Sequence, residues 1–410
     1  KMNKIDRRKF LKYSALASTS LLVPSFLKGF EAKEIYSNPQ LSKLLSGGKK
    51  LIVVQLSGGN DGLNTVIPYS TDLYYSLRPK LSVEAGKVLK LNDELAFNPV
   101  MSKLKEVFDK GNLSIINNVG YPNPDRSHFR SMDIWQSGSA SNEYLSTGWL
   151  GRYLDSECQS CRNPYSAIEV ESTLNLAMKG NKRSGIAVED PQKFYMNSSE
   201  RFLLDLAEKN KNDHHDDSNV SYLYKTLIET TSSAEYVYEN SKIYKSKIDY
   251  PNTEFGKNLR TISQMIISNI DTTVYYVSMS GFDTHVNQSG RQERLLKELS
   301  DGLYSITEDL RMNDRLNEVL ILTFSEFGRR VKENGSGGTD HGTANNLFLI
   351  GGDLKTPGIY NTPPDLSNLN DGDLNYEIDF RSVYSTVLSN WLEADSGLIM
   401  GSDFDRLNII

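Results

Sequence analysis

Short apolar runs rich in β-branched residues recur along the chain and predict buried strands. The clearest are LIVVQL (51–56), LSIINNV (113–119), VYYVSM (274–279), VLILTF (319–324) and NLFLIG (346–351). Runs of this length without polar alternation are typical of strands that are covered on both faces, as in parallel sheets. We therefore expect these five runs to form the centre of a mostly parallel sheet.

Segments with helical periodicity lie between the runs. Residues 293–310 place five apolar side chains on one helical face: Leu295, Leu296, Leu299, Leu303 and Ile306. Residues 99–111 end in a glycine that is typical of a helix C-terminus, and residues 379–394 begin with Asp379, a favourable N-cap. Alternating strands and helices predict a three-layer α/β/α fold with a mostly parallel central sheet.

The middle of the chain, about residues 152–257, interrupts this alternation. It is polar and mostly helical by composition, which indicates an insertion or cap. Its stretch NKNDHHDDSN (210–219) could bind a metal weakly at the surface, although a flexible polar loop is the simpler interpretation. Cys158 and Cys161 form a CxxC pair, for which we favour a loop-closing disulfide or two inert thiols over redox chemistry or a zinc site.

The first 32 residues have the features of a targeting segment. Arg7 and Arg8 precede Lys-Phe-Leu-Lys and a weakly apolar stretch at 15–27, a combination that resembles the bacterial twin-arginine export signal. The stretch is too short and too interrupted to span a bilayer, and no other stretch is long or apolar enough. We therefore expect an exported, periplasmic location reached through the twin-arginine export machinery; an amphipathic N-terminal helix is the alternative.

Composition narrows the class of protein. The chain has 410 residues, of which 38% are hydrophobic, and this supports a sizeable core, which we expect to be one domain over residues 51–392. Its net charge of −6 argues against a nucleic-acid partner. It has only five histidines, so the position of each is informative.

Acids and histidines follow the predicted strands, where ligands of open parallel sheets bind. In chain order these are Asp61, then Ser127 and His128, then Asp283 and His285, then Glu326 and Arg329, and finally Asp340 and His341. One such pair would more often be a hydrogen-bonded loop. Four strand ends that carry carboxylates and imidazoles instead indicate a site for a divalent metal such as zinc or manganese.

Four residues are candidates to act on a substrate: Ser127, His128, Arg126 and Arg329. Ser127 stands at a predicted helix start, where it is either a nucleophile assisted by a nearby metal or arginine, or simply an N-cap. Arg126 and Arg329 are candidates to hold an anion, because guanidinium groups match phosphate and sulfate geometry.

Together these motifs resemble a known family. They are VVQLSGGNDGLNTVIP, RSHFRSMDIWQSG, GWLGRYL, GFDTH, LTFSEFGR, GTDHGTANN and DFRSVYSTVL, and they resemble the bacterial exported proteins of domain of unknown function 1501. The resemblance runs from about Leu51 to Leu392. That family is usually placed in the alkaline phosphatase superfamily, whose members hold two metals over a parallel sheet and cleave phosphate or sulfate esters.

The resemblance also implies residue roles. Asp61 matches a metal position, Ser127 the nucleophile, Asp283 and His285 a metal-binding pair, and His341 the final histidine. The loop SEFG (325–328) then stands where the superfamily has Ser-Asp-His-Gly. In the other register Asp340-His341-Gly342 is that motif, and no histidine is left downstream.

In the first register, which we prefer, Phe327 replaces a metal-binding histidine. One metal position keeps its Asp283, His285 and His341, whereas the other keeps Asp61 and Glu326 without an imidazole. Either the second position is an oxygen-only site for a harder ion, or the protein holds one metal or none. His128 is a possible substitute ligand.

The resemblance thus implies an exported metal-dependent hydrolase of phosphate or sulfate esters, whose partner would be an anionic ester substrate or a glycan, with Asp340 orienting His341. The alternative is a non-catalytic member that binds a glycan or a partner protein. A third possibility is that the acids and histidines form only a buried polar network.

Overall fold

The structure, a computed structural model, describes residues 48–157, 163–200, 203 and 219–410, and Lys49–Ile410 form one unit. The predicted targeting segment, the CxxC cysteines and the histidine pair of residues 210–219 lie outside the described residues. The account below concerns the unit that begins at Lys49.

All five predicted strands are present in one sheet. They are β1 (Lys50–Ser57), β5 (Leu113–Gly120), β8 (Val274–Ser280), β9 (Val319–Phe324) and β10 (Asn345–Gly351). Their order in the middle of the sheet is β5-β10-β9-β1-β8. Nearly every residue of these strands is buried, as the apolar runs predict.

The sheet is mostly parallel, with one exception. Leu51 of β1 lies opposite Val274 of β8 and Leu320 of β9, and both pairings are parallel. Strand β10 runs antiparallel to β5 and β9, so the expectation of a parallel strand at residues 346–351 is wrong. The reason is the connection: no helix lies between β9 and β10, and a parallel pair needs a crossover.

Short strands extend the sheet at both edges. They are β6 (Ala167–Glu169) and β7 (Ile186–Ala187) beyond β8, and β11 (Gly358–Ile359) and β14 (Ile378–Asp379) beside β5, which gives nine strands among the described residues. The segment 152–257 does carry the expected helices, α8 (Pro191–Ser198) and α10 (Asn219–Ser241). It also contributes β6 and β7, so it is part of the sheet as well as an insertion.

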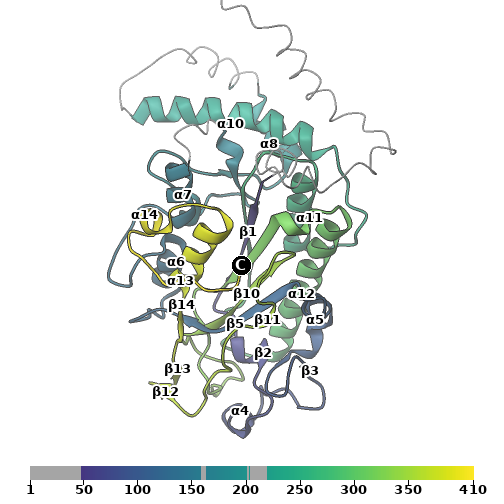
Figure 1. Ribbon diagram of the computed structural model, residues 1–410, viewed down its shortest axis with the longest axis vertical. Coiled ribbons are helices and arrows are strands. Elements are labelled where there is room, and N and C mark those ends of the chain that lie inside the picture. Colours follow the sequence, from purple (N-terminus) through teal and green to yellow (C-terminus); the bar gives the residue numbers. More distant parts are fainter. Residues whose placement is uncertain (1–47, 158–162, 201–202, 204–218) are drawn as a thin grey trace, which may run out of the picture. The chain divides into compact units, whose positions relative to one another are not determined.

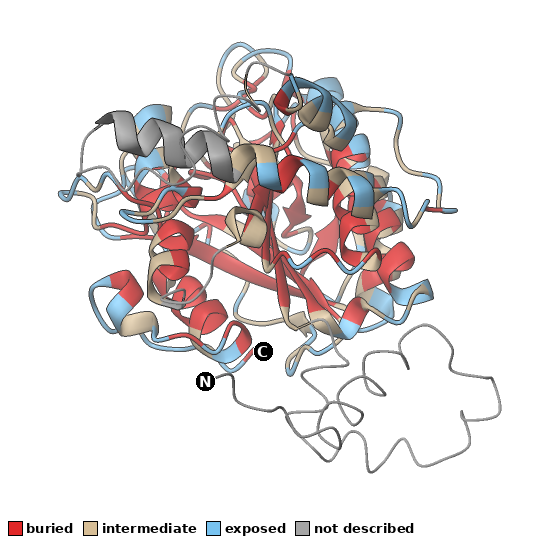
Figure 2. Cartoon of the chain, turned by 90° about the horizontal axis from the view of Figure 1, so that it is seen from above, coloured by how far each residue is buried: buried red, intermediate tan, exposed pale blue. Residues whose placement is uncertain are grey.

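Helices cover both faces of the sheet (Figure 1). One face carries α5 (Ser102–Asp109), α11 (Glu254–Ile267) and α12 (Gln288–Met312), and the other carries α6 (His128–Ser137), α7 (Trp149–Glu157), α13 (Phe380–Thr386) and α14 (Ser396–Met400). Alternate residues of β1 serve the two cores: Ile52 packs into the first, and Leu51 into the second. The fold is therefore a three-layer α/β/α sandwich, with its strands buried between helices (Figure 2).

Smaller elements complete the unit. They are α4 (Asp72–Leu77), the three-stranded sheet of β2 (Val66–Ile67), β3 (Leu89–Lys90) and β4 (Ala96–Phe97), and the hairpin of β12 (Leu369–Asn370) and β13 (Asp373–Leu374). Single turns of 3₁₀ helix occur at Gly62–Asn64, Pro99–Met101, Pro164–Ser166, Leu176–Met178 and Leu316–Glu318, and Val387–Trp391 form a π turn. Asp379 caps α13 as predicted, because its side chain accepts a hydrogen bond from the backbone N–H of Arg381. In the part of the chain that the structure describes, no helix is both long enough and apolar enough to cross a membrane.

Candidate metal centre

The turn after β1 brings three strand ends into contact. Gly58 donates its N–H to Oε1 of Glu326 at 2.8 Å, and it adopts φ +120°. A Cβ at Gly58 would lie 2.4 Å from the backbone nitrogen of Asp283, and one at Gly59 would lie 2.3 Å from the Phe327 ring. Only glycines permit this close approach, so the turn packs the ends of β1, β8 and β9 against each other.

Three histidines reach this corner, and each has an acceptor on Nδ1. Nδ1 of His128 lies 2.8 Å from Oε1 of Glu326, and Nδ1 of His285 lies 3.2 Å from Oδ1 of Asp340. Nδ1 of His341 lies 2.7 Å from the carbonyl oxygen of Arg126. These acceptors assign the ring proton to Nδ1, which leaves the lone pair of each Nε2 free.

The three Nε2 atoms converge on one carboxylate oxygen. Oδ1 of Asp283 lies 3.0 Å from Nε2 of His285, 3.4 Å from that of His341 and 3.6 Å from that of His128. The Nε2 atoms of His285 and His341 are 2.9 Å apart, and Nε2 of His128 is buried without a hydrogen-bond partner. Within the described residues, the ligand atoms of His128, Asp283 and His341 all lie within 4.8 Å of one another, and so do those of His285, His341 and Asp283.

This arrangement fits a divalent metal ion. Two Nε2 lone pairs that face each other at 2.9 Å repel unless a cation or a proton lies between them. Ligand atoms of a tetrahedral zinc site are about 3.3 Å apart, and the spacings around Asp283 fall on both sides of that value. An acceptor behind each imidazole is also the usual support of a metal-binding histidine. The residues that would hold the ion are His128, His285, His341 and Asp283.

Arg329 is buried and holds the corner together from within. Its guanidinium is buried and donates to the carbonyl oxygens of Gly58, Gly59, Phe282 and Thr339. It also lies 2.7 Å from Oδ1 of Asp283. Its donors are thus engaged by the protein, which does not support the predicted role of holding an anion.

The charges around the histidines give them different basicities. Partial burial, the largest single effect, would raise the pKa of Asp283, but the hydrogen bond and charge of Arg329, with help from His285 and His341, lower this pKa to about 2. The hydrogen bond to Glu326 raises the pKa of His128. Burial lowers the pKa of His341, which has no carboxylate behind it. Asp283 is therefore ionised over the whole useful pH range, as a ligand must be.

Two predicted ligands stand behind the histidines. Glu326 is fully buried, and it holds His128 through Oε1 while Oε2 accepts a hydrogen bond from Ser325 at 3.2 Å. Asp340 contacts His285 and not the adjacent His341, so our expectation that it orients His341 is wrong. In these positions Glu326 and Asp340 each orient a histidine. A direct bond from either carboxylate to a metal stays a prediction.

Asp61 lies in a separate, buried ion pair. Its Oδ2 is 2.6 Å from Nη1 of Arg78, and neither side chain is more than 1% exposed. Gln288 also donates to this oxygen, whereas Oδ1 is buried without a partner. The role of Asp61 as a metal ligand stays a prediction, and its present partners give it a structural role.

Ser127 and Arg126 begin α6 beside the histidines. Ser127 occupies the N-cap position and is exposed, but its hydroxyl makes no capping hydrogen bond. The Arg126 guanidinium contacts Asp371 and Asp373 of the β12–β13 hairpin, while its carbonyl oxygen holds His341. The simple N-cap interpretation of Ser127 therefore leaves its hydroxyl unexplained.

A cavity of about 280 Å³ adjoins the centre. Its lining includes Tyr121, Asn123, Arg126, Phe327, Asp371 and Tyr376. Phe327 links the two regions, because its ring centroid also lies 4.9 Å from that of His128 and 4.6 Å from that of His341. The cavity is large enough for a small polar organic group next to the metal ligands.

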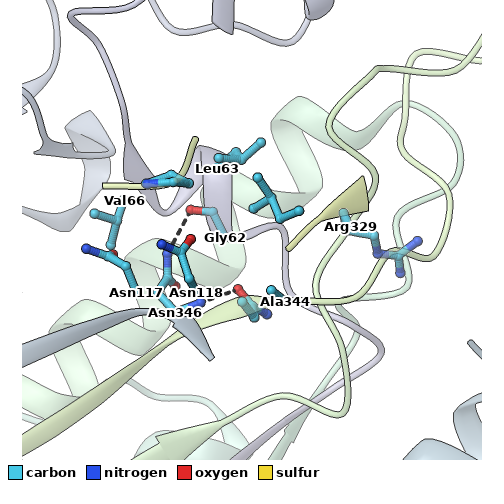
Figure 3. A pocket seen from close by; sticks show the side chains of 11 residues that line it. Gly62, Leu63, Val66, Asn117, Asn118, Arg329, Ala344 and Asn346 are labelled. Carbon is cyan, nitrogen blue, oxygen red and sulfur yellow. Dashed lines mark hydrogen bonds between the residues drawn. The ribbon is translucent and has the colours of Figure 1, made fainter. Parts of the chain in front are cut away.

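A second cavity near Arg329 is much smaller, at about 10 Å³. Figure 3 shows Asn117, Asn118 and Asn346 around it, with Asn346 donating to the Gly62 carbonyl oxygen at 3.0 Å. That volume holds one water molecule at most. It is therefore not a substrate site.

Sequence reasoning missed three residues that support the centre: Arg78, Gln288 and Asn334. Arg78 and Gln288 hold Asp61, and Asn334 donates to Oδ1 of Asp340 at 3.1 Å. Each lies in or next to a polar loop, so no periodic pattern marks it. The only available signal was the number of acids in loops that need a donor.

Comparisons with known proteins identify a family and several distant structures. A family model described as "Protein of unknown function (DUF1501)" matches residues 48–389. No curated protein matches the chain. Similar solved structures include the PsFucS1 sulfatase from Pseudoalteromonas sp., at 11% identity and a TM-score of 0.40, over 92% of this chain and 74% of that one.

Two other structures are similarly distant. The C-terminal periplasmic domain of EcEptC from Escherichia coli has 10% identity and a TM-score of 0.39, over 88% of this chain and 89% of that one. The phosphonate monoester hydrolase SpPMH from Silicibacter pomeroyi has 6% identity and a TM-score of 0.40, over 87% and 78%. Likeness at this level carries no functional argument, so function has to come from the geometry of the site.

Proposed function

The chain belongs to the DUF1501 family of proteins of unknown function, and we propose from the geometry of its site that it is an exported metal-dependent hydrolase of phosphate or sulfate esters. The observation that carries the proposal is the convergence of three imidazole Nε2 atoms on Oδ1 of Asp283. A divalent cation removes the repulsion between these lone pairs and binds all of them at once.

The side chains have separate tasks. His128, His285, His341 and Asp283 hold the ion, which when bound supplies Lewis-acid stabilisation of the negative charge on an ester oxygen. Glu326, Asp340 and the Arg126 carbonyl oxygen keep each imidazole in the tautomer that binds metal. Arg329 keeps Asp283 ionised and in place.

Ser127 is the proposed nucleophile. Its hydroxyl is exposed and not used for capping, and it directly precedes His128, a ligand. It also stands at the N-terminus of a ten-residue helix, where backbone N–H groups favour an anionic group. Attack by its hydroxyl on phosphorus or sulfur would displace the alcohol and leave a serine ester for water to cleave.

The organic part of the ester is assigned to the 280 Å³ cavity. Asn123 and Tyr376 offer amide and hydroxyl groups, and the nearby charges of Arg126 and Asp371 compensate each other. This lining suits an uncharged polar group such as a sugar, with the ester group towards Phe327 and the histidines. A glycan ester is therefore the favoured substrate class.

Export is proposed on the sequence alone. Residues 1–32 resemble a twin-arginine signal, and this route accepts proteins that have already folded around a metal. The expected location is the periplasm or the cell exterior.

The first test is metal content followed by activity. Purified protein is analysed by mass spectrometry for metals and then assayed with p-nitrophenyl phosphate, p-nitrophenyl sulfate and sulfated or phosphorylated monosaccharides. We expect bound zinc or manganese, turnover of at least one ester, and loss of both in His341→Ala. Absence of metal from the wild-type protein, with none taken up on titration, would overturn the proposal.

A non-catalytic binding protein is the second candidate. It is favoured by one specific observation: the guanidinium groups of Arg126 and Arg329, both predicted to hold an anion, are engaged by the protein itself. On that hypothesis the metal stays and the cavity binds a glycan without turnover. Metal content without activity on any ester would support it.

A further inference from the structure

The two acids that resemblance assigns to a second metal already have partners within the protein. Asp61 is paired with the buried Arg78 at 2.6 Å. Glu326 accepts hydrogen bonds from His128, Gly58 and Ser325. The charge of Asp61 is thus offset by Arg78, and both oxygens of Glu326 accept hydrogen bonds, so Oδ1 of Asp61 is the one oxygen of the two acids without a partner.

The space beside the histidines is apolar. Phe327 is 1% exposed, and its ring packs against those of His128 and His341. Gly59 leaves room for that ring and for no larger group, since a Cβ there would lie 2.3 Å from it. An aromatic ring offers no ligand atom, so this wall cannot complete a second coordination shell.

A permanent positive charge already occupies the interior side of the centre. Arg329 is fully buried and lies 2.7 Å from Oδ1 of Asp283. Four backbone carbonyl oxygens accept its other hydrogen bonds. A second dication next to this guanidinium would be repelled, and Oδ1 of Asp61 is the one oxygen of the two acids that is not already bound by the protein.

We infer that the chain holds one divalent ion, on His128, His285, His341 and Asp283, and that the buried guanidinium groups of Arg329 and Arg78 replace a second ion. The inference rests on the proposed function because it concerns the same metal centre. It goes further because it assigns half of the positive charge of the centre to two arginine side chains. A chelator can remove a metal ion, but it cannot remove these charges. Arg329 is a positioning residue, since it acts through Asp283.

The experiment counts bound ions. Metal is removed from the purified protein with a chelator, the protein is dialysed against excess zinc and desalted, and its mass is measured by native mass spectrometry. In parallel, the metal-free protein is titrated with cobalt, and the visible absorption of the bound cobalt is recorded. We expect one ion per chain and saturation at one equivalent of cobalt. Two ions per chain would overturn the inference and leave the proposed hydrolase intact, whereas none would overturn both.

Variants assign the ligands independently of activity. Asp61→Asn and the double variant Asp61→Asn/Arg78→Met, which removes both charges of the pair, should still bind one zinc ion with a Kd within about threefold of wild type. His128→Ala and His285→Ala should weaken zinc binding at least 100-fold. Zinc binding that survives in both histidine variants but is lost in folded Asp61 variants would place the ion elsewhere and overturn the assignment.

Discussion

Glu326 and His128 form a buried carboxylate–imidazole pair, with Oε1 of Glu326 lying 2.8 Å from Nδ1 of His128. Because the same oxygen accepts the Gly58 N–H, Glu326→Ala leaves two donors unsatisfied. We expect a loss of about 1–3 kcal/mol in the free energy of unfolding and a 10–100-fold loss of zinc affinity. Urea denaturation and zinc titration measure the two effects.

Glu326→Gln is the matched control for that variant. Its amide oxygen can still accept from His128 and Gly58, and its amide nitrogen can face Ser325. It should therefore recover most of the lost stability. Equal losses in the two variants would show that the charge of Glu326, and not its hydrogen bonds, supports the site.

Ser127→Ala separates chemistry from structure. The hydroxyl of Ser127 caps nothing, so its removal should change the free energy of unfolding by less than about 0.5 kcal/mol and leave zinc content unchanged. Turnover of the ester should fall by roughly 1000-fold or more if the hydroxyl is the nucleophile. Steady-state kinetics with the ester that the wild-type protein cleaves fastest measure this loss.

Thr253→Ala shows whether the denaturation assay detects a lost cap. Thr253 accepts a hydrogen bond from the Gly256 N–H at the start of α11. Its removal should cost about 1 kcal/mol. A similar loss in Ser127→Ala would assign Ser127 to helix capping and remove it from the chemistry.

Gly59→Ala should disturb the centre without touching a ligand. Gly59 has φ +74°, and the added Cβ would lie 2.3 Å from the buried Phe327 ring, which packs against His128 and His341. We expect a loss of at least about 2 kcal/mol in unfolding free energy, together with weaker zinc binding. Gly86→Ala, where no atom lies within 4 Å, is the control and should be neutral; a Gly59 variant as stable as this control would contradict the packing argument.

Arg78→Met should be among the most destabilising single changes. It leaves the buried Asp61 without its partner, and such a loss typically costs about 3–5 kcal/mol. Asp61→Asn/Arg78→Met should recover part of that loss, because no buried charge is then left unpaired. If the double variant were the less stable of the two, the ion pair would not explain the cost.

The raised pKa of Glu169 should make the free energy of unfolding depend on pH. Burial raises the pKa of Glu169 from 4.5 to about 8. Between these values the folded chain keeps a proton that the unfolded chain releases, so the free energy of unfolding falls as pH rises. The slope from this group is about 1.4 kcal/mol per pH unit, and it vanishes above pH 8.

Denaturation at several pH values tests this slope. Glu169→Gln cannot titrate, so its unfolding free energy should vary less between pH 5 and 8 than that of the wild type. Glu84→Gln, at an exposed carboxylate, is the control and should keep the wild-type slope. An unchanged slope in Glu169→Gln would mean that other groups set the pH dependence.

The sequence predicted the positions of the central strands, but it did not predict the direction of β10 or the short strands at the edge of the sheet. Residues 51–56 and 319–324 are mostly apolar runs without polar alternation, and burial on both faces of a sheet demands such runs. Burial says nothing of direction, so the antiparallel course of β10 was missed. Strands β6 and β7 have three and two residues, too few to show any period.

The positions of the candidate ligands could be predicted from the order of residues along the chain, whereas the partners that support them could not. His128, Asp283, His285 and His341 follow strand ends, and the topology brings strand ends together. The partners of Asp61 and Asp340 depend on tertiary packing, which places Gln288 and Asn334 in reach. Nothing in the spacing of these residues reveals such contacts.

The carbonyl oxygen of Arg126 is held by a histidine that comes 215 residues later in the chain. His128 likewise depends on an acid 198 residues away, so the ligand set spans most of the described fold. Closing such long loops is slow, and the site forms only when β9 and β10 have joined the sheet. Retention of a metal ion would therefore show that synthesis and folding are complete. A partly synthesised chain could not hold the metal, so it could not take up the ion before folding has finished.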